Sequence, residues 1–323
     1  MSEIIKDYGA TVDPEVYKRA LQGHQYIPQA DQCIRDLVRA HCMSIKSRHR
    51  HILDIGCGPG RLTFSLAHQY STVIGLDISG GFIDYANRYL VANESRLPGY
   101  VHFHKMDFTK DELPKPEGSM ESNKHLYEVL VAQGVLHHMH GNDRIAFIKR
   151  CHEVLRDDGI LIVGDEFIRD YVTPEERRLN VAAFYLHIID EAVKGGFHEL
   201  TLEECKNLVD DVLSGEKGCG HANEELFAYI RRTAETFNSQ FYAGMLTKIP
   251  GQELGEFVEN VRKLAERLAD EFPTESFNRG DYKTSIPLFV EEMERYGFLP
   301  KETRKIGPVD QLGGMGVLVF MKA

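Results

Sequence analysis

Apolar residues follow two alternating patterns along the chain from about residue 51 onward. Short continuous apolar runs predict buried strands at residues 51–55, 71–77, 100–107, 128–134 and 160–167. Helical spacing of apolar positions predicts intervening helices at residues 63–68, at residues 143–155 and after Ser79, a residue type that caps helices. This alternation indicates a parallel sheet covered by helices on both faces, with ligand sites at the carboxyl ends of its strands.

The alternation stops over residues 172–283, where several amphipathic helices are predicted in succession without strands. Residues 285–298 then predict a further helix that covers the sheet, and residues 301–307 and 315–323 predict two strands. The fold class that follows is α/β, a Rossmann-like, doubly wound, mostly parallel sheet with an antiparallel C-terminal strand. We expect four units: an N-terminal helical lid (1–50), the core (51–171), a helical cap insertion (172–283) and a closing helix and strand hairpin (284–323).

The composition narrows the class of protein. The chain of 323 residues has a formal net charge of −11, which disfavours a general nucleic-acid-binding surface. It contains no run of about 18 apolar residues, so no membrane-spanning helix is expected. The N-terminus lacks the basic start and apolar run of a secretory signal, and the six cysteines have no short paired spacing. We therefore expect a cytoplasmic protein with reduced thiols.

A glycine-rich loop follows the first predicted strand, with Gly56, Gly58 and Gly60 at alternate positions. A dinucleotide-binding loop has its last glycine at the position that Arg61 occupies here, and the Gly-Lys-Ser/Thr end of a triphosphate-binding loop is absent. Asp54 lies within the strand, where a carboxylate would repel phosphate but suits a cationic or amine-bearing ligand. The loop therefore favours a different adenosine-bearing molecule.

With these motifs in order over about residues 50–168, the chain resembles the class I S-adenosylmethionine-dependent methyltransferases. It is most similar to the small-molecule group that includes the ubiquinone and menaquinone C-methyltransferases. The resemblance implies S-adenosyl-L-methionine as the cofactor, held in three regions. The residues implied are the loop against the methionine part (Asp54, Gly56, Cys57, Gly58, Gly60), Asp77 on the ribose hydroxyls with Ile78 on the adenine, Asp107 on the adenine amino group between Met106 and Phe108, and Gln133 with Gly134 at the sulfonium end.

Candidate catalytic and substrate residues follow the fourth and fifth strands. His137 or His138 is a candidate general base, and Asp165, Glu166 and the cap aromatics Tyr185 and Phe241 are candidate acceptor contacts. The histidine cluster of His137, His138 and His140 has no cysteine or carboxylate at ligand spacing, so no metal site is predicted. Simpler readings stay open. Asp77 could cap a helix, Asp54 could bond its own loop, Asp107 could be a turn residue, and the cap aromatics could be core.

The expected function is transfer of a methyl group to a small, partly hydrophobic organic acceptor, at an oxygen, nitrogen or carbon atom. Such transfer mainly requires alignment, and it needs a base only when the acceptor carries a proton of high pKa. The alternatives are a methyltransferase that acts on a protein or RNA, a protein of the same fold that binds the cofactor without transferring methyl, and a nicotinamide enzyme. The cap either closes over the site or mediates assembly into a homo-oligomer.

Overall fold

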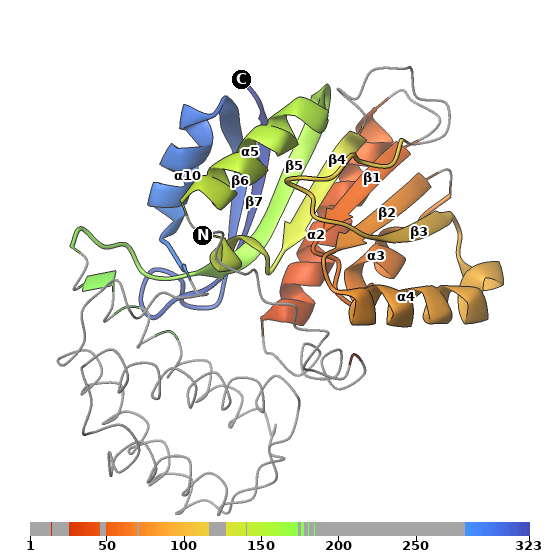
Figure 1. Ribbon diagram of the computed structural model, residues 1–323. Helices are drawn as coiled ribbons and strands as arrows, with labels where there is room; N and C mark the ends of the chain where they lie inside the picture. The colour runs from red at the N-terminus through yellow and green to blue at the C-terminus, as the bar shows by residue number, and fades with distance from the viewer. Residues whose placement is uncertain are drawn as a thin grey trace, which may run out of the picture.

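The computed structural model describes residue 14, residues 26–45, 50–69, 71–115, 127–139, 141–173 and 282–323, and residues 176, 177, 180 and 184. Its centre is a seven-stranded sheet of order β3-β2-β1-β4-β5-β7-β6 (Figure 1). The strands are β1 Arg50–Ile55, β2 Ser71–Asp77, β3 Tyr100–Lys105, β4 Tyr127–Gln133, β5 Leu155–Phe167, β6 Phe298–Ile306 and β7 Gly314–Lys322. The helices are α2 Ile27–Ser44, α3 Arg61–Leu66, α4 Gly80–Asn93, α5 Asn142–Val154 and α10 Ile286–Arg295, with short 3-10 turns η2 Glu94–Arg96 and η3 Leu136–His138.

The direction of the strands confirms the predicted fold class. Strands β1 to β5 pair in parallel, whereas β7 runs antiparallel to both β5 and β6. The connection from β1 through β2 to β3 runs toward one edge of the sheet, and β4 starts again on the other side of β1. The carboxyl ends of β1 and β4 therefore meet at the point where the strand order reverses, which is where open α/β sheets bind ligands.

Alternate residues of each central strand are buried on opposite faces of the sheet. Ile52 of β1 lies in the cluster covered by α2, α3 and α4, whereas Leu53 lies in the cluster covered by α5 and α10 (Figure 1). Both side chains have no exposed surface. Because helices cover both faces, the central strands carry continuous apolar runs rather than an alternating pattern, as the sequence predicted.

The fifth strand begins earlier than the sequence predicts. The apolar run predicts a strand from residue 160, yet Asp157, Asp158 and Gly159 already belong to β5. The pairing of β5 with β4 jumps between Tyr127 and Val129, so the extra residues form a bulge. A side chain at Gly159 would lie 2.8 Å from the carbonyl oxygen of Glu128, which explains why glycine stands where the two strands come together again.

Helix α2 is an integral part of the fold. Ala30 and Ile34 are fully buried, and the helix packs on β5 and β7. Residues 1–25, apart from Pro14, lie outside the described part, so the N-terminal lid stays a prediction. The same holds for the cap insertion, of which the structure describes only residues near its two ends. Within the described residues, no helix has both the length and the apolar character needed to cross a membrane.

Candidate active site

The glycine loop between β1 and α3 adopts a backbone conformation that favours glycine. Gly56, Gly58 and Gly60 have φ angles of 71°, 54° and 84°, all in the left-handed region. A Cβ atom on Gly56 would lie 2.4 Å from Cγ2 of Val135, which follows β4. The loop is therefore pressed against the turn after β4, and it cannot carry a side chain at Gly56 without displacing that turn.

Asp77, at the carboxyl end of β2, holds the loop from the other side. Its Oδ2 accepts a hydrogen bond from the Gly58 N–H at 2.8 Å, and its Oδ1 accepts one from the Ser79 N–H at 2.8 Å. Ser79 is the N-cap of α4 and accepts from the Phe82 N–H at 3.3 Å. The carboxylate thus joins the loop and the start of α4. This structural role is additional to the predicted contact with ribose.

Asp54 lies beneath the loop and is only 2% exposed. The Thr63 hydroxyl donates a hydrogen bond to its Oδ2 at 2.6 Å. Burial raises the pKa of Asp54 to about 7, the Thr63 hydrogen bond opposes this shift, and the charge of Asp77 adds to it. Burial thus disfavours the charged form of Asp54, so its carboxyl group repels phosphate less than an exposed carboxylate would.

The third predicted cofactor region follows β3. Asp107 accepts hydrogen bonds from the Thr109 N–H and hydroxyl at 3.0 and 2.6 Å, and it pairs with Lys110 at 2.6 Å. Burial raises its pKa, but the hydrogen bonds from Lys110 and Thr109 outweigh burial and hold it below the usual value. Phe108 is 4% exposed and packs on Phe147 at a centroid distance of 5.2 Å, which favours a core role.

Two other predicted cofactor residues lie close to this region. Ile78 and Met106 are half-buried, and the Met106 N–H donates to the Asp77 carbonyl at 2.8 Å. The ends of β2 and β3 are thereby tied together. Contact of any of these side chains with the adenine ring stays a prediction.

His137 and Asp165 form a pair at the carboxyl ends of β4 and β5. His137 Nδ1 lies 2.5 Å from Asp165 Oδ1, and the other carboxylate oxygen accepts from the Leu136 N–H at 2.7 Å. Burial alone would lower the pKa of His137, but the charge and hydrogen bond of Asp165 outweigh it, so the pKa is raised. Burial would likewise raise the pKa of Asp165, yet His137 and the Glu166 N–H hold it below its ordinary value.

This geometry allows His137 to accept a proton. With Nδ1 turned to Asp165, the Nε2 atom makes no hydrogen bond to any of the described residues. The side chain is 11% exposed. His137 lies two residues after Val135, whose side chain packs beside Gly56, so the turn that carries the imidazole borders the glycine loop. A carboxylate that orients an imidazole through Nδ1 is an arrangement suited to general base catalysis.

The other predicted catalytic and substrate residues differ in their surroundings. The His138 ring packs on His137 with a centroid distance of 3.8 Å. Glu166 is 6% exposed and pairs with Lys283 at 2.9 Å, and Asp165 is engaged by His137, so an acceptor contact by either carboxylate stays a prediction. Tyr185 and Phe241 lie outside the described residues.

A buried amide near the site has no partner among the described residues. The oxygen and nitrogen of the Gln133 side chain, at the end of β4, are both buried and form no hydrogen bond there. Room for this side chain comes from Gly164, because a Cβ there would lie 3.3 Å from Gln133 Cγ. A buried polar group without a partner is costly, so a ligand is expected to satisfy it.

The sequence did not single out a second polar group on the same side of the sheet. Asp31 of α2 is 5% exposed and forms an ion pair with Arg61, the first residue of α3. Its Oδ1 has no hydrogen-bond partner in the part of the chain that the structure describes. In the sequence, Arg61 is notable only because it departs from the dinucleotide motif, and Asp31 belongs to no motif. Only the packing of α2 beside the loop reveals this pair.

Cofactor chemistry fits these residues better than a metal ion or a reactive thiol. No three His, Cys, Asp or Glu side chains come together as a metal site among the described residues, which do not include His140. Burial raises the pKa of the Cys57 thiol well above its usual value, which disfavours a nucleophilic role for this loop residue. The glycine cradle and the unpartnered Gln133 amide, in contrast, suit an organic ligand with polar ends.

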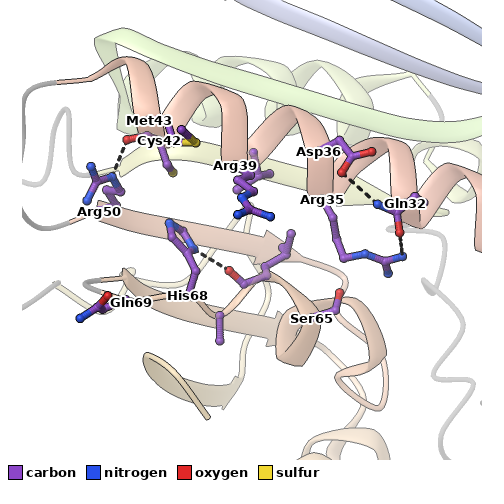
Figure 2. A pocket seen from close by; sticks show the side chains of 13 residues that line it. Gln32, Arg35, Asp36, Arg39, Cys42, Met43, Arg50, Ser65, His68 and Gln69 are labelled. Atoms are coloured by element: carbon purple, nitrogen blue, oxygen red, sulfur yellow. Dashed lines mark hydrogen bonds between the residues drawn. The ribbon is translucent and has the colours of Figure 1, made fainter.

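A groove of about 630 Å³ lies away from this site, along α2 (Figure 2). Figure 2 shows side chains of α2, among them Arg35 and Arg39, on one side and His68 on the other. Arg50, at the start of β1, also lines it and donates from Nε to the Cys42 carbonyl at 2.6 Å. The groove is therefore at the amino ends of the strands, and none of the predicted site residues lines it.

Comparison with known proteins identifies the domain. Residues 52–159 match the family model described as "Methyltransferase domain". The chain is 30% identical over 125 residues to N-terminal Xaa-Pro-Lys N-methyltransferase 1 of Danio rerio, an alignment that covers 38% of this chain and 51% of that protein. It is 27% identical over 162 residues to the Homo sapiens protein of the same name, covering 50% of this chain and 67% of that one.

Solved structures with a distant likeness to this chain include two methyltransferases. The CurJ carbon methyltransferase has a TM-score of 0.49 at 13% identity, with 94% of this chain and 57% of that chain covered. Magnesium protoporphyrin IX methyltransferase from Synechocystis has a TM-score of 0.43 at 14% identity, with 91% and 83% covered. The family match, rather than these distant likenesses, is informative: residues 52–159 match a methyltransferase domain, which supports S-adenosylmethionine as the cofactor.

Proposed function

We propose that this chain transfers the methyl group of S-adenosylmethionine to a nitrogen or oxygen atom that must lose a proton, with His137 as the base that accepts it. The observation that carries the proposal is the His137–Asp165 pair at the carboxyl ends of β4 and β5. A carbon acceptor likewise exchanges a proton for the methyl group, so C-methyl transfer of the quinone-methyltransferase type stays an alternative.

Among the described residues, candidates are available for holding the ribose and the methionine part of the cofactor. When bound, the cofactor supplies a methyl group activated by a positively charged sulfur. Asp77 would hold the ribose hydroxyls, and the loop at Gly56–Gly60 would allow close approach of the methionine part. Asp31 and the Gln133 amide are buried and have atoms without hydrogen-bond partners among the described residues, so they would hold the polar end of that part.

The reaction then depends on alignment and on one proton. Asp165 holds His137 through Nδ1 and also accepts the Leu136 N–H, so the imidazole has little freedom to turn. The Nε2 atom would take the acceptor proton as the new bond to the methyl group forms. Such a positioned base contributes about 10²- to 10⁴-fold to a rate.

The leading acceptor class is a small, partly hydrophobic amine or alcohol. It is supported by the apolar and aromatic sequence of residues 172–283. We also propose a cytoplasmic location and an insertion that either closes over the site or mediates assembly into a homo-oligomer.

A second acceptor class is favoured by a separate observation. The relatives named above carry names that denote methylation of a protein N-terminus that begins Xaa-Pro-Lys. An α-amino group also loses a proton before it can attack, so the His137–Asp165 pair would serve it equally well. This chain spans about half of the Danio rerio relative, and the specificity of that protein is here only an alternative.

The experiment is a methyl-transfer assay that measures S-adenosylhomocysteine release with two acceptor sets. One set contains small aromatic and aliphatic amines, phenols and alcohols, and the other contains hexapeptides that begin Ser-Pro-Lys or Ala-Pro-Lys. Their N-acetylated versions are the matched controls. Turnover with any of the small acceptors supports the leading acceptor class. Turnover only with the free-amine peptides supports the second acceptor class, protein N-termini, instead. Calorimetry with S-adenosylhomocysteine shows that the protein is competent, and tight binding without turnover on either set would contradict both.

A further inference from the structure

The insertion rejoins the core directly beside the proposed base. The Tyr282 N–H donates to the His137 carbonyl at 2.6 Å, and the Thr284 carbonyl accepts from the Ile168 N–H at 3.1 Å. Ser285 donates from its hydroxyl to Asp170 at 2.7 Å. Residues 282–285, the return segment, are therefore fixed onto the end of β5 by hydrogen bonds on both sides of Lys283.

Lys283 is buried within this segment together with Glu166. The two side chains are 2% and 6% exposed, and Lys283 Nζ lies 2.9 Å from Glu166 Oε2. The same Nζ lies 5.1 Å from the centroid of the Phe184 ring. The Arg177 guanidinium donates to the Lys283 carbonyl at 3.0 and 2.7 Å. Removal of a buried charged pair from water is costly, so its presence here calls for a functional reason.

The charges around His137 supply that reason. Asp165 contacts it from β5, and the His138 ring packs on it from η3. Glu166 is the next residue of β5, and Lys283 follows Tyr282, whose N–H donates to the His137 carbonyl, so both of these charges act on the imidazole at longer range. Lys283 opposes a proton on the imidazole, whereas both carboxylates favour one. Without Lys283, two carboxylates would hold the proton on His137, and a base that is already protonated cannot accept another.

We propose that Lys283 is a positioning residue for His137: paired with Glu166, it cancels the charge of the second carboxylate and leaves Asp165 alone to orient the imidazole. This inference rests on the proposed function of His137 as the base. It also gives the insertion a role in the chemistry of the core, because Lys283, Arg177 and Phe184 all come from it. The proton affinity of His137 then depends on whether the return segment is seated.

The experiment is a double-mutant cycle on the pair, with the full-length protein. Glu166→Gln, Lys283→Met and the double variant are compared by NMR titration of a ¹³C-labelled His137 ring and by the pH dependence of kcat/KM. Lys283→Met is expected to raise the pKa of His137 by about half a pH unit or more, and Glu166→Gln to lower it by a similar amount. The double variant is expected to return close to the wild-type value, and Lys283→Arg, which keeps the charge, to shift it little.

The kinetic profile is expected to follow the titration. On the acid limb of the pH profile, kcat/KM of Lys283→Met should fall about threefold relative to wild type for each half unit by which the pKa of His137 rises, because only the neutral imidazole accepts a proton. A purely structural role would instead lower stability in both single variants without opposite titration shifts, and this result would overturn the proposal. If the titration shifts occur but the acid limb does not move, Lys283 still governs His137 while the assignment of His137 as the base fails.

Should Lys283→Met not fold, Lys283→Arg, Glu166→Gln and the neutral double variant still test the proposal. Equal His137 pKa values in Glu166→Gln and the wild type would refute it.

Discussion

The carboxylate of Asp77 accepts the backbone N–H of Gly58 at 2.8 Å and so joins the end of β2 to the middle of the glycine loop. The two residues belong to separate predicted cofactor regions, the ribose contact and the methionine contact. Their hydrogen bond makes these regions one unit, so a change at Asp77 also changes the loop.

Substitution of Asp77 by alanine is expected to weaken S-adenosylhomocysteine binding by about 1.5–3 kcal/mol, the size of hydrogen bonds to a charged group. Isothermal titration calorimetry measures the change. Asp77→Asn is the matched variant, since its side chain keeps an oxygen that can accept from Gly58 but loses the charge. Thermal unfolding of the cofactor-free proteins separates loss of loop support from loss of ribose contact. An unchanged dissociation constant in Asp77→Ala would remove the ribose assignment.

Gly56→Ala is expected to destabilise the fold more than Gly134→Ala. Both glycines have positive φ angles, 71° and 67°, so each alanine costs about 1–2 kcal/mol in backbone strain. Only at Gly56 would the new Cβ meet a neighbour, Val135 Cγ2 at 2.4 Å, whereas nothing lies within 4 Å at Gly134. The clash adds about 1–3 kcal/mol. Urea denaturation gives the two free energies of unfolding, and equal values would mean that the turn after β4 yields freely.

His137→Gln is expected to reduce kcat by about 10²- to 10⁴-fold with little change in S-adenosylhomocysteine affinity, because the base is lost and the loop is not. His138→Gln is the control, with an expected effect of a few-fold. The wild-type rate should rise with pH through a limb that lies above 6.5, the ordinary imidazole value, because the Asp165 charge raises the pKa of His137. A larger loss in His138→Gln than in His137→Gln would exchange the two roles.

Asp54→Asn is expected to change the pH dependence of stability. The pKa of Asp54 is about 7 in the folded protein and 3.8 in the reference state, so folding disfavours its charged form. The resulting destabilisation is absent below the lower value, grows as pH rises toward 7 and is complete above it. Each pKa unit corresponds to about 1.4 kcal/mol, so the variant should gain a few kcal/mol relative to wild type between pH 4 and pH 8. Asparagine keeps an oxygen for Thr63, and Thr63→Val controls for that bond. Parallel stability curves of the two proteins would contradict the buried, raised carboxyl group.

Local sequence patterns predicted most of the fold, because each pattern depends only on residues that are close together in the sequence. The apolar runs gave the parallel strands, and Ser79 caps α4 as expected, since capping involves residues only three apart. Gly58 and Asp77 lie at the carboxyl ends of the neighbouring parallel strands β1 and β2, so the order of the motifs also predicted that they are close. The bulge in β5 was missed, because Asp157-Asp158-Gly159 is typical of a turn and only the pairing with β4 shows otherwise.

The polar pairs of the site were beyond the reach of local patterns. Asp31 meets Arg61, and Glu166 meets Lys283, across long stretches of chain, and neither pair follows a spacing rule. His137 and His138 were equal candidates in the sequence, since both follow β4. What separates them is the contact of His137 with Asp165, which depends on how β4 and β5 align in the sheet.

The two ends of the insertion lie side by side on the core, because Phe167 bridges to Thr284 as the chain leaves β5. A segment that departs and returns at neighbouring points imposes no length on what lies between them. Insertions of different size and sequence can therefore be exchanged at this junction, by recombination in evolution or by graft in the laboratory, while the cofactor edge stays intact. With the acceptor contacts proposed for the insertion, such an exchange would change the acceptor range, provided that the return segment with Lys283 is kept.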